Sequence, residues 1–262
     1  MKEEGEKRFA LLQACKDSDY VKKRYGGYFN VFFDAYGEEG QRWDLYRVVD
    51  GEFPETEELE KYEGFVITGS AFDAHGNELW ILRLCLLLRT LNAMQKKVLG
   101  ICFGLQILCR ALGGKTGRAI GGWDIGIKEV RMVEDLDSHP LFSGLEISKV
   151  VTIIKIHQNV ALEMPLDAGL LARSDQTSIE MFSIGDHILA IQGHPEYTMD
   201  ILFNLVERLR NQNEIESDFV EDLKARLESA EPEREVWKKI CKNFLNRRLT
   251  RESSKFIMVE DV

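Results

Sequence analysis

The chain has 262 residues, of which 44% are hydrophobic and 30% charged, a composition typical of a globular protein large enough to bury a sizeable core. Its net charge of −10 argues against binding to nucleic acid, and it means that an acidic substrate must be held by local donors. Five cysteines without paired spacing, and no apparent signal peptide, predict free thiols in the reducing environment of the cytosol.

Apolar runs separated by a helical pattern predict an α/β fold for the first half of the chain. We expect strands at residues 9–12, 43–49, 64–68 and 98–101, and an amphipathic helix at residues 79–94. Strands that alternate with helices indicate βαβ units and therefore a parallel sheet. The longest apolar run, residues 81–91, contains Arg83 and Arg89 and is too short to span a membrane.

Beyond Gly114 the pattern changes to strands, followed by helices at the end of the chain. Strand-like segments occupy residues 126–133, 150–156 and 179–190, the last with a hairpin turn at Gly185-Asp186. Helices are predicted at residues 198–211 and 214–248, with Pro232 marking a new helix start. We expect a single domain over residues 1–262, made of a core at about 8–211, a C-terminal helical extension at about 212–248 and a polar tail at 249–262.

The segment Gly100-Ile101-Cys102-Phe103-Gly104 lies between a strand-like run and a helix-like run. This G-x-C-x-G pattern is the cysteine counterpart of the nucleophile elbow, a tight turn from strand to helix that exposes the reactive side chain. Glycines flank the nucleophile because a Cβ would clash in the crowded turn. The helix N-terminus favours a thiolate at Cys102. The alternative for Cys102 is a buried thiol that packs as a small hydrophobic residue.

A second motif, Gly193-His194-Pro195-Glu196-Tyr197, follows a strand-like apolar run. A histidine just past the end of a strand is placed to react rather than to pack, and Glu196 is near enough to orient its ring. Cys102, His194 and Glu196 thus predict a nucleophile, a base and a residue that orients the base. The alternative for His194 is an ordinary histidine in a turn.

Other kinds of site are not supported by the sequence. Residues 110–116 approach a phosphate-binding loop, but the Walker pattern needs glycine where Cys109 stands, and no G-x-G-x-x-G is present. His75, His139 and His187 have no metal-ligand spacing with cysteines or carboxylates. We therefore expect no metal and no cofactor.

The elbow followed by the G-H-P-E motif resembles the class I glutamine amidotransferase family. More narrowly, the chain is similar to the plant γ-glutamyl peptidases of that superfamily, over roughly residues 8 to 248. The resemblance implies a flavodoxin-like three-layer sandwich with a mostly parallel central sheet. It rests on the elbow around Cys102 and on residues 25–32, 65–70, 192–197, 230–232 with Trp237, and 241–245.

The resemblance also implies roles for residues around the predicted nucleophile. The backbone N–H groups of Gly69, at the end of the third predicted strand, and of Phe103 would form an oxyanion hole. Gln106, one helical turn after Cys102, would help to hold the α-amino-acid end of a glutamyl group. The other substrate-binding candidates are Ser70, His157, Gln158 and Asn159, although His157 alone is more often a structural histidine.

The wall beside the leaving group has two candidate segments, residues 71–77 and 24–30. Within the second segment, Arg24 would pair with the glycine carboxylate of a tripeptide. The alternative for Arg24 is an arginine on the exposed surface.

These residues predict acyl transfer through a γ-glutamyl thioester on Cys102, with His194 protonating the departing nitrogen and then activating water. Glutamine and γ-glutamyl peptides share the acyl half, so the elbow does not separate them. The resemblance implies hydrolysis of glutathione or its S-conjugates to glutamate and a Cys-Gly product, with a link to glutathione turnover and to glucosinolate formation.

Two alternatives remain at this level. A glutaminase subunit would deliver ammonia to a partner synthetase, but the sequence shows no ATP motif, and we expect no obligatory synthetase partner. A non-catalytic regulatory relative would not need the intact set of Cys102, His194 and Glu196. We expect a cytosolic hydrolase that acts on a small γ-glutamyl substrate and has no nucleic-acid or membrane partner.

Overall fold

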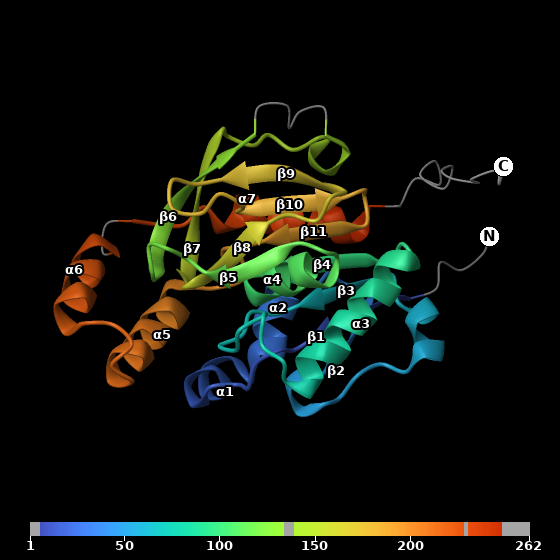
Figure 1. Ribbon diagram of the computed structural model, residues 1–262, viewed down its shortest axis with the longest axis horizontal. Helices are drawn as coiled ribbons and strands as arrows, with labels where there is room; N and C mark the ends of the chain where they lie inside the picture. The colour runs from blue at the N-terminus through green and yellow to red at the C-terminus, as the bar shows by residue number, and fades with distance from the viewer. Residues whose placement is uncertain (1–5, 134–138, 228–229, 248–262) are drawn as a thin grey trace.

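The computed structural model describes residues 6–133, 139–227 and 230–247 (Figure 1). The polar tail predicted at residues 249–262 lies outside these residues. The strands are β1 (Lys7–Leu12), β2 (Gln41–Tyr46), β3 (Gly64–Ile67), β4 (Lys97–Ile101), β5 (Lys115–Arg118), β6 (Asp124–Met132), β7 (Val150–His157), β8 (Asn159–Glu163), β9 (Ala168–Arg173), β10 (Met181–Ile184) and β11 (Ile188–Ile191). The α-helices are α1 (Asp19–Tyr25), α2 (Tyr28–Tyr36), α3 (Leu79–Ala93), α4 (Phe103–Ala111), α5 (Met199–Asn211), α6 (Ser217–Leu227) and α7 (Arg234–Asn246).

A nine-stranded sheet forms the centre of the molecule, in the order β2-β1-β3-β4-β11-β10-β9-β6-β7, and β5 pairs with β8 in a separate ribbon. The strands from β2 to β11 in this order pair in parallel. The neighbours from β11 to β7 pair antiparallel, so that β6 and β10 run against the other seven strands of the sheet. The predicted α/β fold with a mostly parallel central sheet is confirmed.

Helices cover both faces of this sheet, because the central strands carry apolar side chains on both sides. In β1, Phe9 and Leu11 belong to a cluster with residues of α2 and α7, whereas Ala10 and Leu12 belong to a cluster with residues of α3 and α4. Figure 1 shows α3 and α7 on opposite sides of the sheet. The predicted three-layer sandwich is therefore confirmed. Within the described residues, no helix is both long and apolar enough to cross a membrane.

Several elements differ from the sequence-based expectation. The strand expected at 43–49 ends at Tyr46, and Val48–Asp50 forms a short 3-10 helix instead. The helical stretch expected at 214–248 is divided into α6 and α7, and α7 begins just after Pro232, as predicted. The elements that the patterns missed are α1, α2, β5, β8 and β9.

One edge of the sheet gathers the residues that the sequence singled out. Because β3, β4, β7 and β11 point the same way, the segments that follow them meet at this edge. In open parallel sheets, ligands bind outside the carboxyl ends of the strands. Gly69 follows β3, Cys102 follows β4, and His194 follows β11.

Candidate active site

Cys102 occupies the turn between β4 and α4. Its φ of 53° and ψ of −104° lie outside the regions that non-glycine residues prefer, so backbone strain is concentrated at this residue. A Cβ on Gly100 would lie 2.6 Å from the backbone of Gly104, and a Cβ on Gly104 would lie 2.7 Å from the carbonyl oxygen of Ile67. Both glycines are therefore required by the close approach of strand and helix.

His194 and Glu196 lie in the segment that follows β11, and both are buried. His194 Nδ1 is 2.8 Å from Glu196 Oε1, and the Cys102 side chain is near enough to raise the pKa of His194. A Cβ on Gly69 would lie 2.9 Å from His194 Cε1 and 3.7 Å from Cys102 Cβ, so this glycine borders both side chains. The geometry places a thiol, an imidazole and a carboxylate in a continuous series.

The surroundings of His194 favour its charged form. Burial lowers the pKa of His194, but the neighbouring Glu196 carboxylate and the Cys102 side chain more than offset this effect and raise the pKa to about 10. The ring of Tyr197 stacks on the imidazole with a centroid distance of 4.0 Å and an interplanar angle of 2°. A positively charged, oriented imidazole beside a cysteine stabilises a thiolate nucleophile.

A cavity of about 460 Å³ opens over Cys102 and His194. The cavity is lined by Gly69 and by most of the predicted substrate-binding residues, namely Ser70, Gln106, His157, Gln158 and Asn159. Its other lining residues include Tyr28, Phe72, Trp123 and Leu205, the cationic side chains of Lys16 and Arg208, and the acidic side chain of Glu214. The cavity therefore presents polar, apolar and charged groups together with the thiol of Cys102.

Comparison with known proteins agrees with this geometry. Residues 26–202 match the family model described as glutamine amidotransferase class-I. The chain belongs to the class I glutamine amidotransferase family. Gamma-glutamyl peptidase 5 of Arabidopsis thaliana is 53% identical over 243 residues, which cover 93% of this chain and 97% of that protein. Gamma-glutamyl peptidase 3 of the same plant is 51% identical, covering 92% and 98% of the two chains. The solved structures similar to this class I amidotransferase fold include a glutamine amidotransferase from Thermotoga maritima, with a TM-score of 0.69, 17% identity and coverage of 92% and 99% of the two chains.

Gln106 and Gln192 link the nucleophile to the segment after β7 through side-chain hydrogen bonds. Gln106 Nε2 donates to the carbonyl oxygen of Asn159 at 2.7 Å and to Gln192 Oε1 at 3.3 Å. Gln192 Nε2 in turn lies 3.6 Å from the sulfur of Cys102. Gln106 thus reaches the cavity as predicted from the resemblance, but its amide also fixes the backbone of the segment after β7. The contact of Gln192 with Cys102 was missed by sequence reasoning, although the sequence places Gln192 at the end of a predicted strand.

His157 presents a neutral ring to the cavity. Both of its ring nitrogens lack a hydrogen-bond partner among the described residues, and burial lowers its pKa to about 3. Its Nε2 is 3.9 Å from Asp124, which is itself paired with the buried Lys155 at 3.1 Å. A neutral imidazole with two unused nitrogens can donate to or accept from a bound substrate. In the part of the chain that the structure describes, no group of three or more His, Cys, Asp or Glu could hold a metal ion.

The candidate oxyanion hole lies between two well-fixed segments. Phe103 is the first residue of α4, where backbone N–H groups have no partner inside the helix. The turn that carries Gly69 is held by Thr68 Oγ1, which donates to the carbonyl oxygen of Gly69 and accepts from the N–H of Ala14, both at 2.9 Å. Ser70 Oγ donates to the carbonyl oxygen of Ala14 at 2.6 Å, so this hydroxyl holds the loop as well as lining the cavity.

Arg24 is not brought to the cavity. It lies in the last turn of α1 and is exposed, because α1 ends at Tyr25, with Gly26 as its C-cap, and only the following segment turns toward the site, where Tyr28 lines the cavity. Of the predicted wall residues, Ala71 and Phe72 line the cavity together with Tyr28. The cationic side chains that line the cavity are Lys16 and Arg208, which sequence reasoning missed because no local pattern links them to the elbow.

Alkylation of the five cysteines is expected to be selective. Burial raises the pKa of Cys15 and of Cys109 to about 12, and it also raises the pKa of Cys85 and Cys241. Cys102 is the thiol at a helix N-terminus beside a charged histidine, an arrangement that stabilises a thiolate. Iodoacetamide near neutral pH should therefore label Cys102 first, as measured by mass spectrometry of peptides over time. Equal labelling rates at all five positions would contradict an activated nucleophile.

Proposed function

We propose that this protein is a cysteine-dependent γ-glutamyl peptidase, which hydrolyses the γ-glutamyl bond of glutathione or of glutathione S-conjugates to glutamate and a Cys-Gly product. The observation that carries the proposal is the series of Cys102, His194 and Glu196, of which Cys102 and His194 line the cavity. The identity of about half the residues to γ-glutamyl peptidases, over nearly the whole of both chains, supports the substrate class.

In the first step, the Cys102 thiolate attacks the γ-carbonyl carbon of the substrate. The N–H groups of Gly69 and Phe103 stabilise the developing oxyanion. The His194 imidazolium gives its proton to the amine nitrogen of the leaving group as the carbon–nitrogen bond breaks. This step leaves a γ-glutamyl thioester on Cys102 and a neutral His194.

In the second step, water cleaves the thioester. His194 takes a proton from the water, whose oxygen forms the new bond to the γ-carbon, and the sulfur of Cys102 departs as a thiolate. Glu196 keeps the imidazole oriented in both steps and stabilises its positive charge. The products are glutamate and an imidazolium–thiolate pair, which is the starting state.

The size and lining of the cavity support a leaving group larger than ammonia. Besides Cys102, the cavity of about 460 Å³ is lined by Phe72 and Trp123 and by the cations Lys16 and Arg208. A dipeptide or its S-substituted form would occupy apolar surface there and bring a carboxylate toward these cations. Hydrolysis of glutamine would leave this space without an occupant.

A glutaminase that supplies a partner synthetase is the second candidate, because the family model and the similar structure from Thermotoga maritima are described as glutamine amidotransferases. Both candidates use the same acyl half and the same triad. They differ in the amine that leaves and in the need for a partner.

The deciding experiment measures glutamate release by the purified protein from glutathione, a glutathione S-conjugate and glutamine side by side, in the presence of a metal chelator and without ATP. The proposal expects kcat/KM for at least one of the two peptides to exceed that for glutamine. A glutaminase rate above that on every γ-glutamyl peptide would favour the amidotransferase subunit. The absence of turnover on all three would favour a non-catalytic relative.

A further inference from the structure

Glu196 has hydrogen-bond partners in addition to His194. Its side chain is fully buried, and its second carboxylate oxygen, Oε2, accepts a hydrogen bond from the hydroxyl of Tyr36 at 3.4 Å. Tyr36 lies on α2 and is itself completely buried. Burial, together with the neighbouring Cys241 and Glu196, raises the pKa of Tyr36 well above its usual range, so this hydroxyl remains a proton donor throughout the working pH range.

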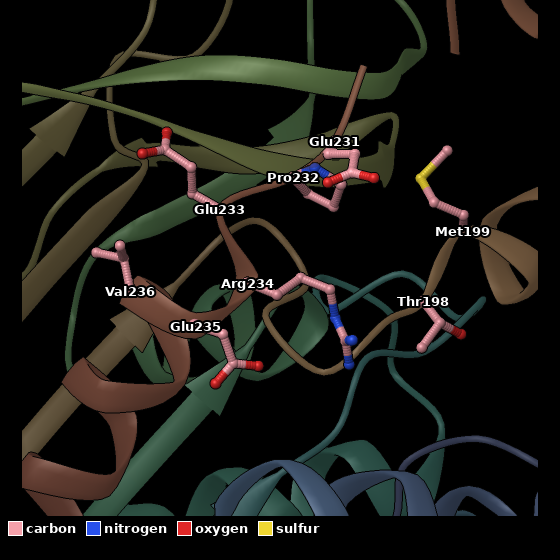
Figure 2. A pocket seen from close by; sticks show the side chains of 8 residues that line it. All are labelled: Thr198, Met199, Glu231, Pro232, Glu233, Arg234, Glu235 and Val236. Atoms are coloured by element: carbon pink, nitrogen blue, oxygen red, sulfur yellow. The ribbon is translucent and has the colours of Figure 1, made fainter. Parts of the chain in front are cut away.

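The backbone of Glu196 has a separate partner on α7. Arg234 Nη2, from the first residue of that helix, donates to the carbonyl oxygen of Glu196 at 3.1 Å. Figure 2 shows the Arg234 side chain extending from the start of α7 toward the segment that carries Thr198. Arg234 and Thr198 both line a second cavity, of about 490 Å³, which is separate from the one over Cys102. Helix α7 therefore holds the backbone of Glu196, the residue that orients His194.

Tyr36 is also tied to α7. Cys241, on α7, contributes to the raised pKa of Tyr36, and the two residues belong to one buried cluster with Cys102. The helix itself is anchored to β7, because Trp237 Nε1 donates to the carbonyl oxygen of Thr152 at 2.9 Å and Glu233 accepts from the N–H of Thr152 at 2.7 Å. The contacts of Tyr36 and of Arg234 with Glu196 thus both depend on how α7 packs against β7 and α2.

We propose that Tyr36 and Arg234 are positioning residues, which fix the side chain and the backbone of Glu196 and through it the ring of His194. This inference, which rests on the proposed function for its kinetic readout, makes α7 part of the catalytic apparatus. The helix lies beyond residues 26–202, the region that the family model matches. A buried carboxylate with one oxygen unpaired would rotate or draw in water, and its hold on the imidazolium would weaken.

Four variants test the proposal: Tyr36→Phe and Arg234→Met, each alone and in combination with Glu196→Gln. Tyr36→Phe removes one hydroxyl and Arg234→Met removes the donor while retaining a long side chain. For each single variant we expect kcat on glutathione to fall by about tenfold to hundredfold with KM within about twofold of wild type. In the Glu196→Gln background, the same changes should cause little further loss, because residues that act through one group are not additive.

Lys238→Met is the matched control, because it removes a cationic side chain of the same helix whose ion pair, with Glu235, reaches neither Glu196 nor Tyr36. Its kcat should stay within about threefold of wild type. Thermal melting of every variant reports whether it is folded, and Arg234→Lys, which keeps a cationic donor, should recover part of the loss if Arg234→Met is unstable. The proposal is overturned if Tyr36→Phe and Arg234→Met keep wild-type kcat, if their losses persist in full in the Glu196→Gln background, or if Lys238→Met lowers kcat as much as they do.

A substrate-free measurement separates this inference from the proposed function. The pH at which iodoacetamide labelling of Cys102 becomes half-maximal reports the support that His194 gives to the thiolate. Glu196→Gln should move this midpoint upward, since a less stable imidazolium supports the thiolate less. Tyr36→Phe and Arg234→Met should move it in the same direction by a smaller amount. If wild type shows no peptidase activity but these shifts appear, the substrate assignment fails while the positioning role stands; unchanged midpoints in both variants would refute the positioning role.

Discussion

Replacing Cys102 with alanine is expected to abolish glutamate release while leaving the protein folded. Alanine cannot form the thioester, so every step after substrate binding is lost. Removal of the nucleophile from a catalytic triad typically lowers kcat by about 10⁴-fold or more, and we expect a loss of that size on glutathione. Initial rates of glutamate release give the effect, and thermal melting checks that the strained turn at this position still folds.

Cys15→Ala is the control for that experiment. Cys15 lines the same cavity as Cys102, but burial raises its pKa to about 12, so its thiol is a poor nucleophile near neutral pH. This variant should keep kcat within about threefold of wild type. Covalent catalysis by Cys102 would be ruled out if Cys102→Ala turned over at the wild-type rate, and a large loss in Cys15→Ala would point to the wrong thiol.

The fold could be predicted where each element carries its own pattern. The runs that became β1, β3 and β4 are apolar and short, and the elbow between β4 and α4 needs glycine on both sides of one residue for reasons visible in the sequence. The ribbon of β5 and β8 was missed because its strands, with the sequence KTGR in one of them, show little apolar alternation. These two strands are stabilised by pairing with each other, which no local pattern records.

The residues of the candidate site likewise fall into those that the sequence predicts and those that only the packing of the helices reveals. Cys102 directly follows β4, and His194 and Glu196 lie in the segment that follows β11, so topology alone brings them to one edge of the sheet. Tyr36 and Arg234 are different, since they reach Glu196 from helices far away in the sequence. Their contacts depend on how α2 and α7 dock on the sheet. Arg24 shows that closeness in sequence is not enough: it lies near the cavity residue Tyr28 in the chain, yet its position in the last turn of α1 leaves it exposed.

His194→Ala is expected to lower kcat nearly as much as Cys102→Ala, because no proton then reaches the leaving amine. Glu196→Gln should be milder, at about 10²-fold to 10⁴-fold, since glutamine keeps the volume of the side chain but removes its charge. In the double variant His194→Ala with Glu196→Gln, the losses of the two single variants should not add, because both residues act on the same proton transfer.

The pH dependence gives the more specific test of this pair. In wild type the pKa of His194 is raised to about 10, so the imidazolium needed by the first step persists into alkaline solution and is lost only as the pH passes that value. Without the Glu196 carboxylate, burial still lowers the pKa of His194 while the largest opposing charge is gone. The alkaline limb of kcat/KM on glutathione should therefore move to lower pH in Glu196→Gln, by at least about one unit. The measurement is a pH profile of wild type and variant in constant ionic strength, with stability confirmed at each pH. An alkaline limb at the same pH in both proteins would show that Glu196 does not stabilise the charge on His194, and the assignment of this carboxylate to the triad would have to be abandoned.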